Sequence, residues 1–96
     1  MTSEQIQEKI SPILHEHDVV FAGLFGSFAR GDANEKSDID IVVRFKKPQS
    51  LLQFFALQNA LESALDHDVD LATERALHPL LRNAILKELR PLYGKR

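Results

Sequence analysis

The sequence predicts an α/β fold. Helical and strand-like stretches alternate along it in the order helix, strand, short helix, strand, helix, strand, helix. No repeat, linker or low-complexity segment interrupts this alternation. The 96 residues are enough for one hydrophobic core and too few for a separate substrate-binding domain, so we predict a single domain over residues 1–96.

The first predicted element is a helix. Thr2 and Gln5 have the spacing of a capping box at its start. Pro12 is expected to kink or divide the helix, because proline cannot donate the helical hydrogen bond. One face of the helix carries the apolar residues Ile6, Ile10, Ile13 and Leu14.

A buried strand and a short helical turn are predicted next. The run VVFAGLF, residues 19–25, is rich in β-branched and aromatic side chains, which favours a strand. The segment SFARG follows it as the helical turn. Ser27 stands at the start of this turn, and Gly31 stands where a left-handed residue commonly ends a helix.

The middle of the chain predicts a second strand and a second long helix. In DIDIVVRF, residues 38–45, the side chains alternate between two faces. One face carries Ile39, Ile41, Val43 and Phe45, and the other carries Asp38, Asp40, Val42 and Arg44. Ser50 and Gln53 then mark the capped start of a helix. Its predicted apolar side is formed by Leu51, Phe54, Phe55, Leu61 and Leu65.

The last third of the chain predicts one more strand and one more helix. The strand is DVDLAT, residues 68–73, and the helix covers residues 78–91, opened by Pro79 and closed by Pro91. The helix has a predicted core stripe of Leu81, Ile85 and Leu89. Further apolar residues, which predict a surface for a partner or for self-association, are Leu80, Leu86, Leu92 and Tyr93.

Two aspartates in the second strand indicate a cation site. Asp38 and Asp40 are two residues apart, so their side chains point the same way, about 7 Å apart by strand rise. Two like charges at this spacing repel, and aspartate is a poor strand former. The pair therefore costs stability unless a positive charge lies between the carboxylates. Mg²⁺ suits the position, because it is commonly held by one or two carboxylates plus substrate phosphates.

A third carboxylate is expected from a neighbouring strand. Asp70 fits, because its neighbours Val69 and Leu71 point to the opposite face. Asp68 shares the face of Asp70 but stands at the entrance of the strand, so it ranks second. With three carboxylates, two magnesium ions can clamp an in-line displacement at phosphorus.

The turn between the first strand and the short helix suits a phosphate. Gly26 allows the backbone to approach a ligand, and Ser27 offers a hydroxyl and free amides at a helix start, so we expect both to hold a triphosphate. A P-loop is excluded, because Asp32 follows Gly31 where that motif requires lysine. A nucleophile elbow is excluded too, because Phe25 replaces its first glycine.

Composition narrows the classes of function. The net charge of -2 and pI of about 6.0 argue against a general nucleic-acid binder, so no direct nucleic-acid binding is expected. No apolar run approaches the ~20 residues of a membrane span, and the start MTSEQIQEKI is unlike a signal peptide. The absence of cysteine excludes disulfides and thiolate metal sites. A cytoplasmic protein without membrane contact is expected.

These motifs together resemble a known family. Gly26-Ser27, ten intervening residues and Asp38-Ile39-Asp40, with ARG and SDIDIVV, are similar to the minimal nucleotidyltransferase (MNT) family of the DNA polymerase beta superfamily. The resemblance covers most of the chain, since the first helix, the VDL strand and the last helix also fall where the family has them. The motif positions show no departure, and Asp70 matches the third carboxylate.

The resemblance implies a fold and an activity. The fold is a small mixed β-sheet flanked by helices, the nucleotidyltransferase fold. The donor is ATP with Mg²⁺, and a nucleotidyl group passes to an acceptor hydroxyl. Family members of this size are typically antitoxins of a HEPN-domain ribonuclease toxin, which they silence by adding AMP to a tyrosine near its active site. The implied partner is therefore a HEPN-domain toxin.

Each motif residue then has an expected role. Asp38 and Asp40 carry the metal that binds the triphosphate, and Asp40 and Asp70 hold a second metal. Asp70 also helps to deprotonate the acceptor hydroxyl. Arg30 has two interpretations of equal weight: it reaches a phosphate, or it is a surface arginine that pairs with Asp32 or Glu35.

Two other classes of function stay open. One is an antitoxin that neutralises its toxin by binding alone, which the electrostatic strain of the carboxylate set disfavours. The other is a nucleotidyltransferase acting on a small molecule, which the short chain disfavours because such relatives carry more structure around the acceptor.

Overall fold

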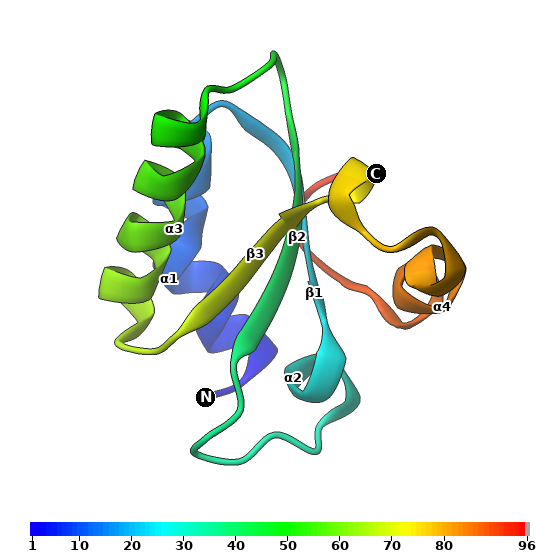
Figure 1. The fold of residues 1–96 in the computed structure, drawn as a ribbon. Coiled ribbons are helices and arrows are strands. Elements are labelled where there is room, and N and C mark those ends of the chain that lie inside the picture. Colours follow the sequence, from blue (N-terminus) through cyan, green and yellow to red (C-terminus); the bar gives the residue numbers. More distant parts are fainter. Residues whose placement is uncertain (96) are drawn as a thin grey trace.

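The computed structural model describes residues 1–95 and confirms the α/β fold with a mixed sheet flanked by helices (Figure 1). The strands are β1 (Val19–Phe25), β2 (Ile39–Phe45), β3 (Val69–Thr73) and β4 (Arg90–Gly94). The helices are α1 (Ser3–Glu16), α2 (Gly26–Arg30), α3 (Leu51–Leu65), α4 (Pro79–Glu88) and the short 3₁₀ turn η1 (Glu74–Ala76). Within residues 1–95, no helix is long and apolar enough to cross a membrane.

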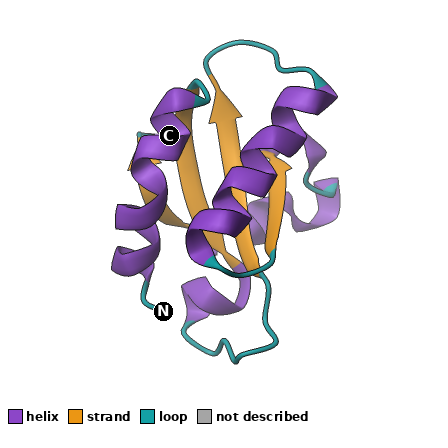
Figure 2. Cartoon of the chain, turned by 90° about the vertical axis from the view of Figure 1, so that its left-hand side faces the viewer, coloured by secondary structure: helices purple, strands orange, loops and turns teal. Residues whose placement is uncertain are grey.

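The sheet has the strand order β3-β2-β1-β4. β1 is antiparallel to both β2 and β4, whereas β2 and β3 are parallel and are joined by α3 as a crossover. α1 and α3 lie side by side on one face of the sheet (Figures 1 and 2). α4 lies on the other side, and α2 follows the end of β1 (Figure 1).

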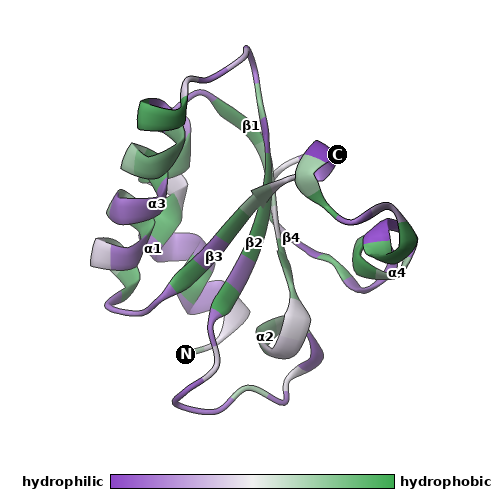
Figure 3. Cartoon of the chain, viewed as in Figure 1, coloured by the Kyte–Doolittle hydropathy of each residue, from purple (hydrophilic) through white to green (hydrophobic). Residues whose placement is uncertain are grey.

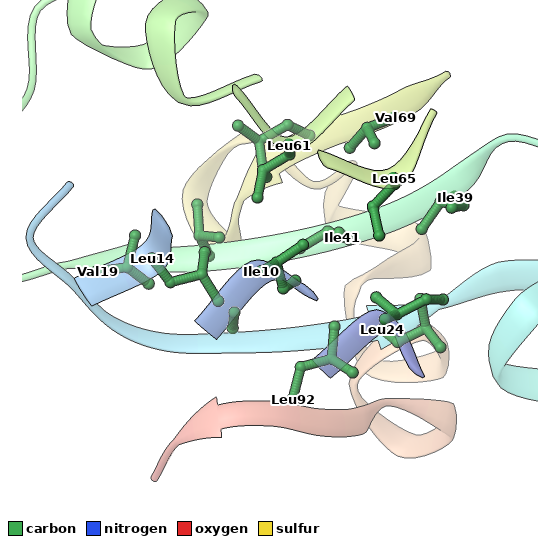
Figure 4. Packing of buried hydrophobic residues seen from close by; sticks show 14 of the residues in the cluster. Ile10, Leu14, Val19, Leu24, Ile39, Ile41, Leu61, Leu65, Val69 and Leu92 are labelled. Atoms are coloured by element: carbon green, nitrogen blue, oxygen red, sulfur yellow. The ribbon is translucent and has the colours of Figure 1, made fainter. Parts of the chain in front are cut away.

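The main core lies between the sheet and the two helices α1 and α3 (Figure 4). Ile39, Ile41 and Val43 of β2 point into it and are fully buried, which confirms the predicted alternation of that strand. The helices contribute Ile6, Ile10, Leu14, Leu57, Leu61 and Leu65.

Both predicted capping boxes are present. The Thr2 hydroxyl accepts from the Gln5 amide at 3.1 Å while the Gln5 side chain accepts from the Thr2 amide at 2.8 Å, and Ser50 and Gln53 repeat the arrangement at the start of α3. α1 is not divided at Pro12. Pro12 is exposed, so water can bond the carbonyl that lacks a helical donor there.

The apolar side predicted for α3 is wrong at Leu51 and Phe55. Leu61 and Leu65 are buried and Phe54 packs against the core, but Leu51 and Phe55 are 74% and 51% exposed. The stripe that faces the core repeats every four residues from Leu57, which the sequence pattern did not single out. Leu51 and Phe55 belong to a different row of the helix surface. Figure 3 shows that the start of α3 is rich in apolar residues.

The predicted end of the last helix at Pro91 is also wrong. α4 ends at Glu88, and the chain continues into β4, a strand that the sequence did not predict. Pro91 lies within β4, which is an edge strand, and a residue without an N–H is tolerated at a sheet edge.

The missed strand changes the surface predicted for the end of the chain. Leu92 is 2% exposed, and Tyr93 packs against the core, because both belong to β4. The core stripe predicted on α4 is wrong, since the helix buries no residue fully and Leu81 is half exposed. Leu80 and Leu81 are the large exposed apolar residues of α4. Of the four residues of the predicted surface, Leu80 alone is exposed, and a partner or self-association surface there stays a prediction.

Leu89, which connects α4 to β4, packs directly over Gly23 of β1. A Cβ added at Gly23 would lie 2.6 Å from the Leu89 side chain, which is closer than carbon atoms pack. Gly23 therefore leaves the space through which the end of α4 reaches the sheet.

We expect Gly23→Ala to lower the stability of the fold by about 1–3 kcal/mol, because overpacking forces neighbours off their preferred positions. Thermal unfolding followed by circular dichroism measures the change. Leu89→Ala should relieve the overlap, so the double variant should lose less stability than the sum of the two single variants. Strict additivity would show that the two residues do not compete for space.

Candidate active site

The predicted site residues gather where the end of β1 meets the starts of β2 and β3 (Figure 1). Phe25 of β1 pairs with Asp40 of β2, and Asp40 pairs with Asp70 of β3. The two aspartates therefore lie in one row across the sheet, on the face opposite Ile39 and the main core. β1 turns into α2 directly after this row, which brings the glycine-serine turn beside the carboxylates.

Gly26 lies against the carboxylate of Asp40. Its φ is +71°, and a Cβ at this position would lie 2.1 Å from Oδ2 of Asp40. Ser27 follows as the second residue of α2, and its carbonyl accepts from the Gly31 amide at 2.9 Å. Gly31 has a φ of +83° and ends the helix in the left-handed conformation, as predicted. Only glycine permits both the backbone conformation and the closeness found at Gly26.

Asp40 is the most perturbed carboxyl of the site. Burial first, then the charges of Asp70 and Asp38 and a hydrogen bond with Asp70, raise the pKa of Asp40 to about 6, while the charge of Arg30 acts in the opposite direction. Above this pH the neighbouring carboxylates repel one another. A cation bound between them would relieve the repulsion.

Asp38 lies at the rim of the row. It is exposed and precedes the first residue of β2, so the strand begins one residue later than predicted. The loop before it is held by His67, whose Nε2 donates to the carbonyl of Ser37 and whose ring meets Phe28 edge-on at 5.7 Å between centroids. Asp38 also lines a cavity of about 580 Å³, together with Glu62, His67 and Asp68.

The structure separates the two aspartates of the third strand. Asp68 precedes β3, its carbonyl accepts from the Ile39 amide at 3.0 Å, and it lines the cavity beside Asp38. Asp70 instead is the residue paired with Asp40. Of the two, Asp70 is thus placed to share a ligand with Asp40.

The donor set suits a metal that arrives with a nucleotide. Among residues 1–95, no three or more His, Cys, Asp or Glu side chains are close enough together to hold a metal ion by themselves. Asp40 and Asp70 provide two carboxylates in contact. Mg²⁺ is usually bound by one or two carboxylates, with substrate phosphates and waters completing its octahedron. The residues present therefore fit Mg²⁺.

The other side of the turn is bonded by Glu88, at the end of α4. The Gly26 amide donates to Oε1 of Glu88 at 3.1 Å, and Nη1 of Arg30 lies 3.4 Å from the same oxygen. Nε of Arg30 also donates to Asp32 at 3.3 Å. The predicted pairing of Arg30 with Asp32 is thus present, whereas its second partner is Glu88 rather than Glu35. No sequence pattern pointed to Glu88, because the contact joins residues 62 positions apart.

Asp40→Asn should stabilise the free protein at neutral pH. A carboxyl whose pKa rises from 3.8 unfolded to about 6 folded contributes stability below pH 4, and this contribution is lost as the pH rises through 6. The full shift corresponds to at most about 3 kcal/mol, and solvent screening of this half-buried group reduces it to about 1 kcal/mol. The variant should therefore melt about 4–8 °C higher than the wild type at pH 7.5.

The same difference should vanish at pH 3.5, where the wild-type carboxyl is already protonated. Asp18→Asn is the matched control. Asp18 is an exposed aspartate directly before the first residue of β1, and asparagine readily adopts its left-handed conformation. Melting curves of the three proteins at both pH values make the comparison. A stability gain that is independent of pH would contradict this account of Asp40.

The chain is similar to known proteins over most of its length. The sequence profile of the polymerase beta nucleotidyltransferase family matches residues 8–96. A candidate protein adenylyltransferase of Methanocaldococcus jannaschii is 46% identical over 88 residues, which are 92% of this chain and 95% of that protein.

Two solved structures of toxin–antitoxin complexes contain a similar chain. One, determined with AMP-PNP, has a TM-score of 0.80 at 30% identity. The match covers 94% of this chain and 74% of the chain in that structure. The other is a tri-AMPylated HEPN toxin of Shewanella oneidensis in complex with an MNT antitoxin. It has a TM-score of 0.74 at 27% identity, and the match covers 98% of this chain and 74% of the chain in that structure.

Proposed function

Since the chain belongs to the polymerase beta nucleotidyltransferase family, we propose that it is an Mg²⁺-dependent protein adenylyltransferase that moves AMP from ATP to a hydroxyl, a tyrosine in particular, of a HEPN ribonuclease toxin. In this role it would act in the cytoplasm as the antitoxin of its partner. The observation that carries the proposal is the row formed by Asp40 and Asp70 beside the Gly26 turn. The similarity to complexes of an MNT antitoxin with an AMPylated HEPN toxin supports the choice of acceptor.

Asp40 and Asp70, with Asp38 at the rim, are the residues that would hold Mg²⁺. When bound, the ion would neutralise the carboxylates and the charge that develops on the phosphates. The raised pKa of Asp40 supports this assignment, because burial and the charges of Asp70 and Asp38 both disfavour an ionised carboxylate that has no cation beside it.

The chain's own groups would position the reactants. Gly26 and Ser27 would bind the triphosphate at the start of α2, and Arg30, on the same helix, would neutralise part of its charge. The acceptor oxygen forms a bond to the α-phosphorus while the bond to the departing pyrophosphate breaks, and the hydroxyl proton passes to the carboxylate of Asp70. Most of the acceleration then comes from positioning and charge neutralisation.

The test is transfer of label from α-labelled ATP, with Mg²⁺, to the protein encoded by the adjacent gene, which the proposal expects to be a HEPN toxin. The expected result is label on the HEPN protein with the wild type and none with Asp38→Asn/Asp40→Asn. Mass spectrometry of the labelled protein then locates the acceptor.

Two results would replace the proposal. If the wild type binds and silences the HEPN protein without any label, and the double variant does the same, the chain acts by binding alone. If label appears on a small hydroxyl compound and never on the HEPN protein, the acceptor class is wrong.

A further inference from the structure

Glu88 makes two contacts in the proposed nucleotide site that its place in the sequence does not suggest. Its Oε1 accepts from the Gly26 amide at 3.1 Å and lies 3.4 Å from Nη1 of Arg30. One carboxylate oxygen therefore joins the turn at the end of β1 to the last residue of the short helix α2.

The guanidinium of Arg30 is shared between two carboxylates. Asp32, which is 62% exposed, pairs with Nε at 3.3 Å, and Glu88, which is 32% exposed, pairs with Nη1 at 3.4 Å. An exposed ion pair holds a side chain weakly, because water screens it and competes for its donors. Both carboxylates raise the pKa of Arg30, Asp32 more than Glu88. Glu88 differs from Asp32 in being less exposed and in also bonding the Gly26 amide.

Glu88 is itself held by the packing around it. The next residue, Leu89, fills the space over Gly23 of β1, and α4 packs against α2. The carboxylate is thus presented from an element fixed to the sheet, whereas Asp32 lies in the loop after α2.

We propose that Glu88 is a positioning residue of the nucleotide site, which fixes the Gly26 turn and the guanidinium of Arg30 beside the place where the triphosphate binds. This inference rests on the proposed function. Without Glu88, Asp32 is the one remaining carboxylate of the two, and it draws the guanidinium of Arg30 toward the loop after α2. The role of Glu88 is therefore in nucleotide binding and not in the transfer step.

Binding of Mg²⁺–AMP-PNP to the full chain, measured by calorimetry, tests the proposal without an acceptor. Glu88→Ala is expected to weaken binding about tenfold, because it removes hydrogen bonds to a charged group. Glu88→Gln is expected to weaken it less, since its amide oxygen still accepts both bonds without the charge. Glu8→Ala, the loss of an exposed glutamate on α1, is the matched control and should bind as the wild type does.

Two further readouts separate positioning from a general loss of structure. In steady-state transfer, Glu88→Ala should raise the KM for ATP about tenfold and change kcat less than about threefold, because the contacts act on the bound nucleotide. Arg30→Ala should weaken binding too, and Glu88→Ala/Arg30→Ala should lose less binding free energy than the sum of the two single variants, because part of the effect of Glu88 passes through Arg30. Melting curves identify any variant that fails to fold, in which case Glu88→Gln carries the test.

The outcomes distinguish this inference from the proposed function. Equal affinity of the wild type and both Glu88 variants, or strictly additive losses with Arg30→Ala, would overturn the role of Glu88 alone. A wild type that binds no Mg²⁺–AMP-PNP would overturn the proposed function as well.

Discussion

Asp40→Asn is expected to lower the rate of AMP transfer by about 10³-fold or more, because the site loses the carboxylate that lies between the turn and Asp70. An asparagine keeps the shape of the side chain and removes the charge that would hold Mg²⁺. The measurement is the initial rate of label transfer at saturating ATP and Mg²⁺.

The fold of this variant should remain intact, since the same substitution is expected to raise the melting temperature. The combination of higher stability with lost activity is what distinguishes a functional carboxylate from a structural one. Asp18→Asn serves again as the control and should transfer AMP at the wild-type rate. If Asp40→Asn retained more than a tenth of the wild-type rate of AMP transfer, the proposed role of Asp40 would be wrong.

Gly26→Ala has the second largest expected effect. The added Cβ would overlap Oδ2 of Asp40, and the φ of +71° is strained for alanine. The backbone strain costs about 1–2 kcal/mol of stability. The overlap displaces the Asp40 carboxylate, so transfer should fall about 10²-fold, as expected when a reacting group is misplaced by about 1 Å. Melting curves and initial rates measure the two effects.

Gly31→Ala separates strain from overlap. Gly31 also has a positive φ, +83°, but a Cβ there would have no atom within 4 Å. Gly31→Ala should lose about as much stability as Gly26→Ala, because the backbone strain is the same. Its rate of AMP transfer should stay within about threefold of the wild-type rate, because the added Cβ overlaps no other group. If both variants lost activity equally, the contact between Gly26 and Asp40 would have no special part in the reaction.

Local signals in the sequence predicted most of the fold correctly. The capping boxes at Thr2 and Ser50, the buried strand over residues 19–25 and the glycine that ends α2 each depend on a few neighbouring residues. The same holds for the row of carboxylates. Alternation along β2 and β3 was enough to put Asp40 and Asp70 on the face opposite the core.

Features that depend on distant residues were missed. Pro91 has the local signature of a helix end, and only the edge position of β4 explains why it lies in a strand. Apolar residues on α3 do not reveal which row faces the sheet, so Leu51 and Phe55 were placed on the wrong side. Glu88 reaches the site only because β4 brings the end of α4 back beside β1.

The parallel pairing of β2 with β3 makes folding and assembly of the site one event. A slip of either strand by one residue would turn its aspartate toward the core and its neighbouring isoleucine or valine toward water. The burial of Ile39 and Ile41 against α1 and α3 penalises every such slip. Burial of the apolar face of the sheet thus fixes the register that places Asp40 beside Asp70. A chain with a mispaired strand would therefore be inactive rather than partly active.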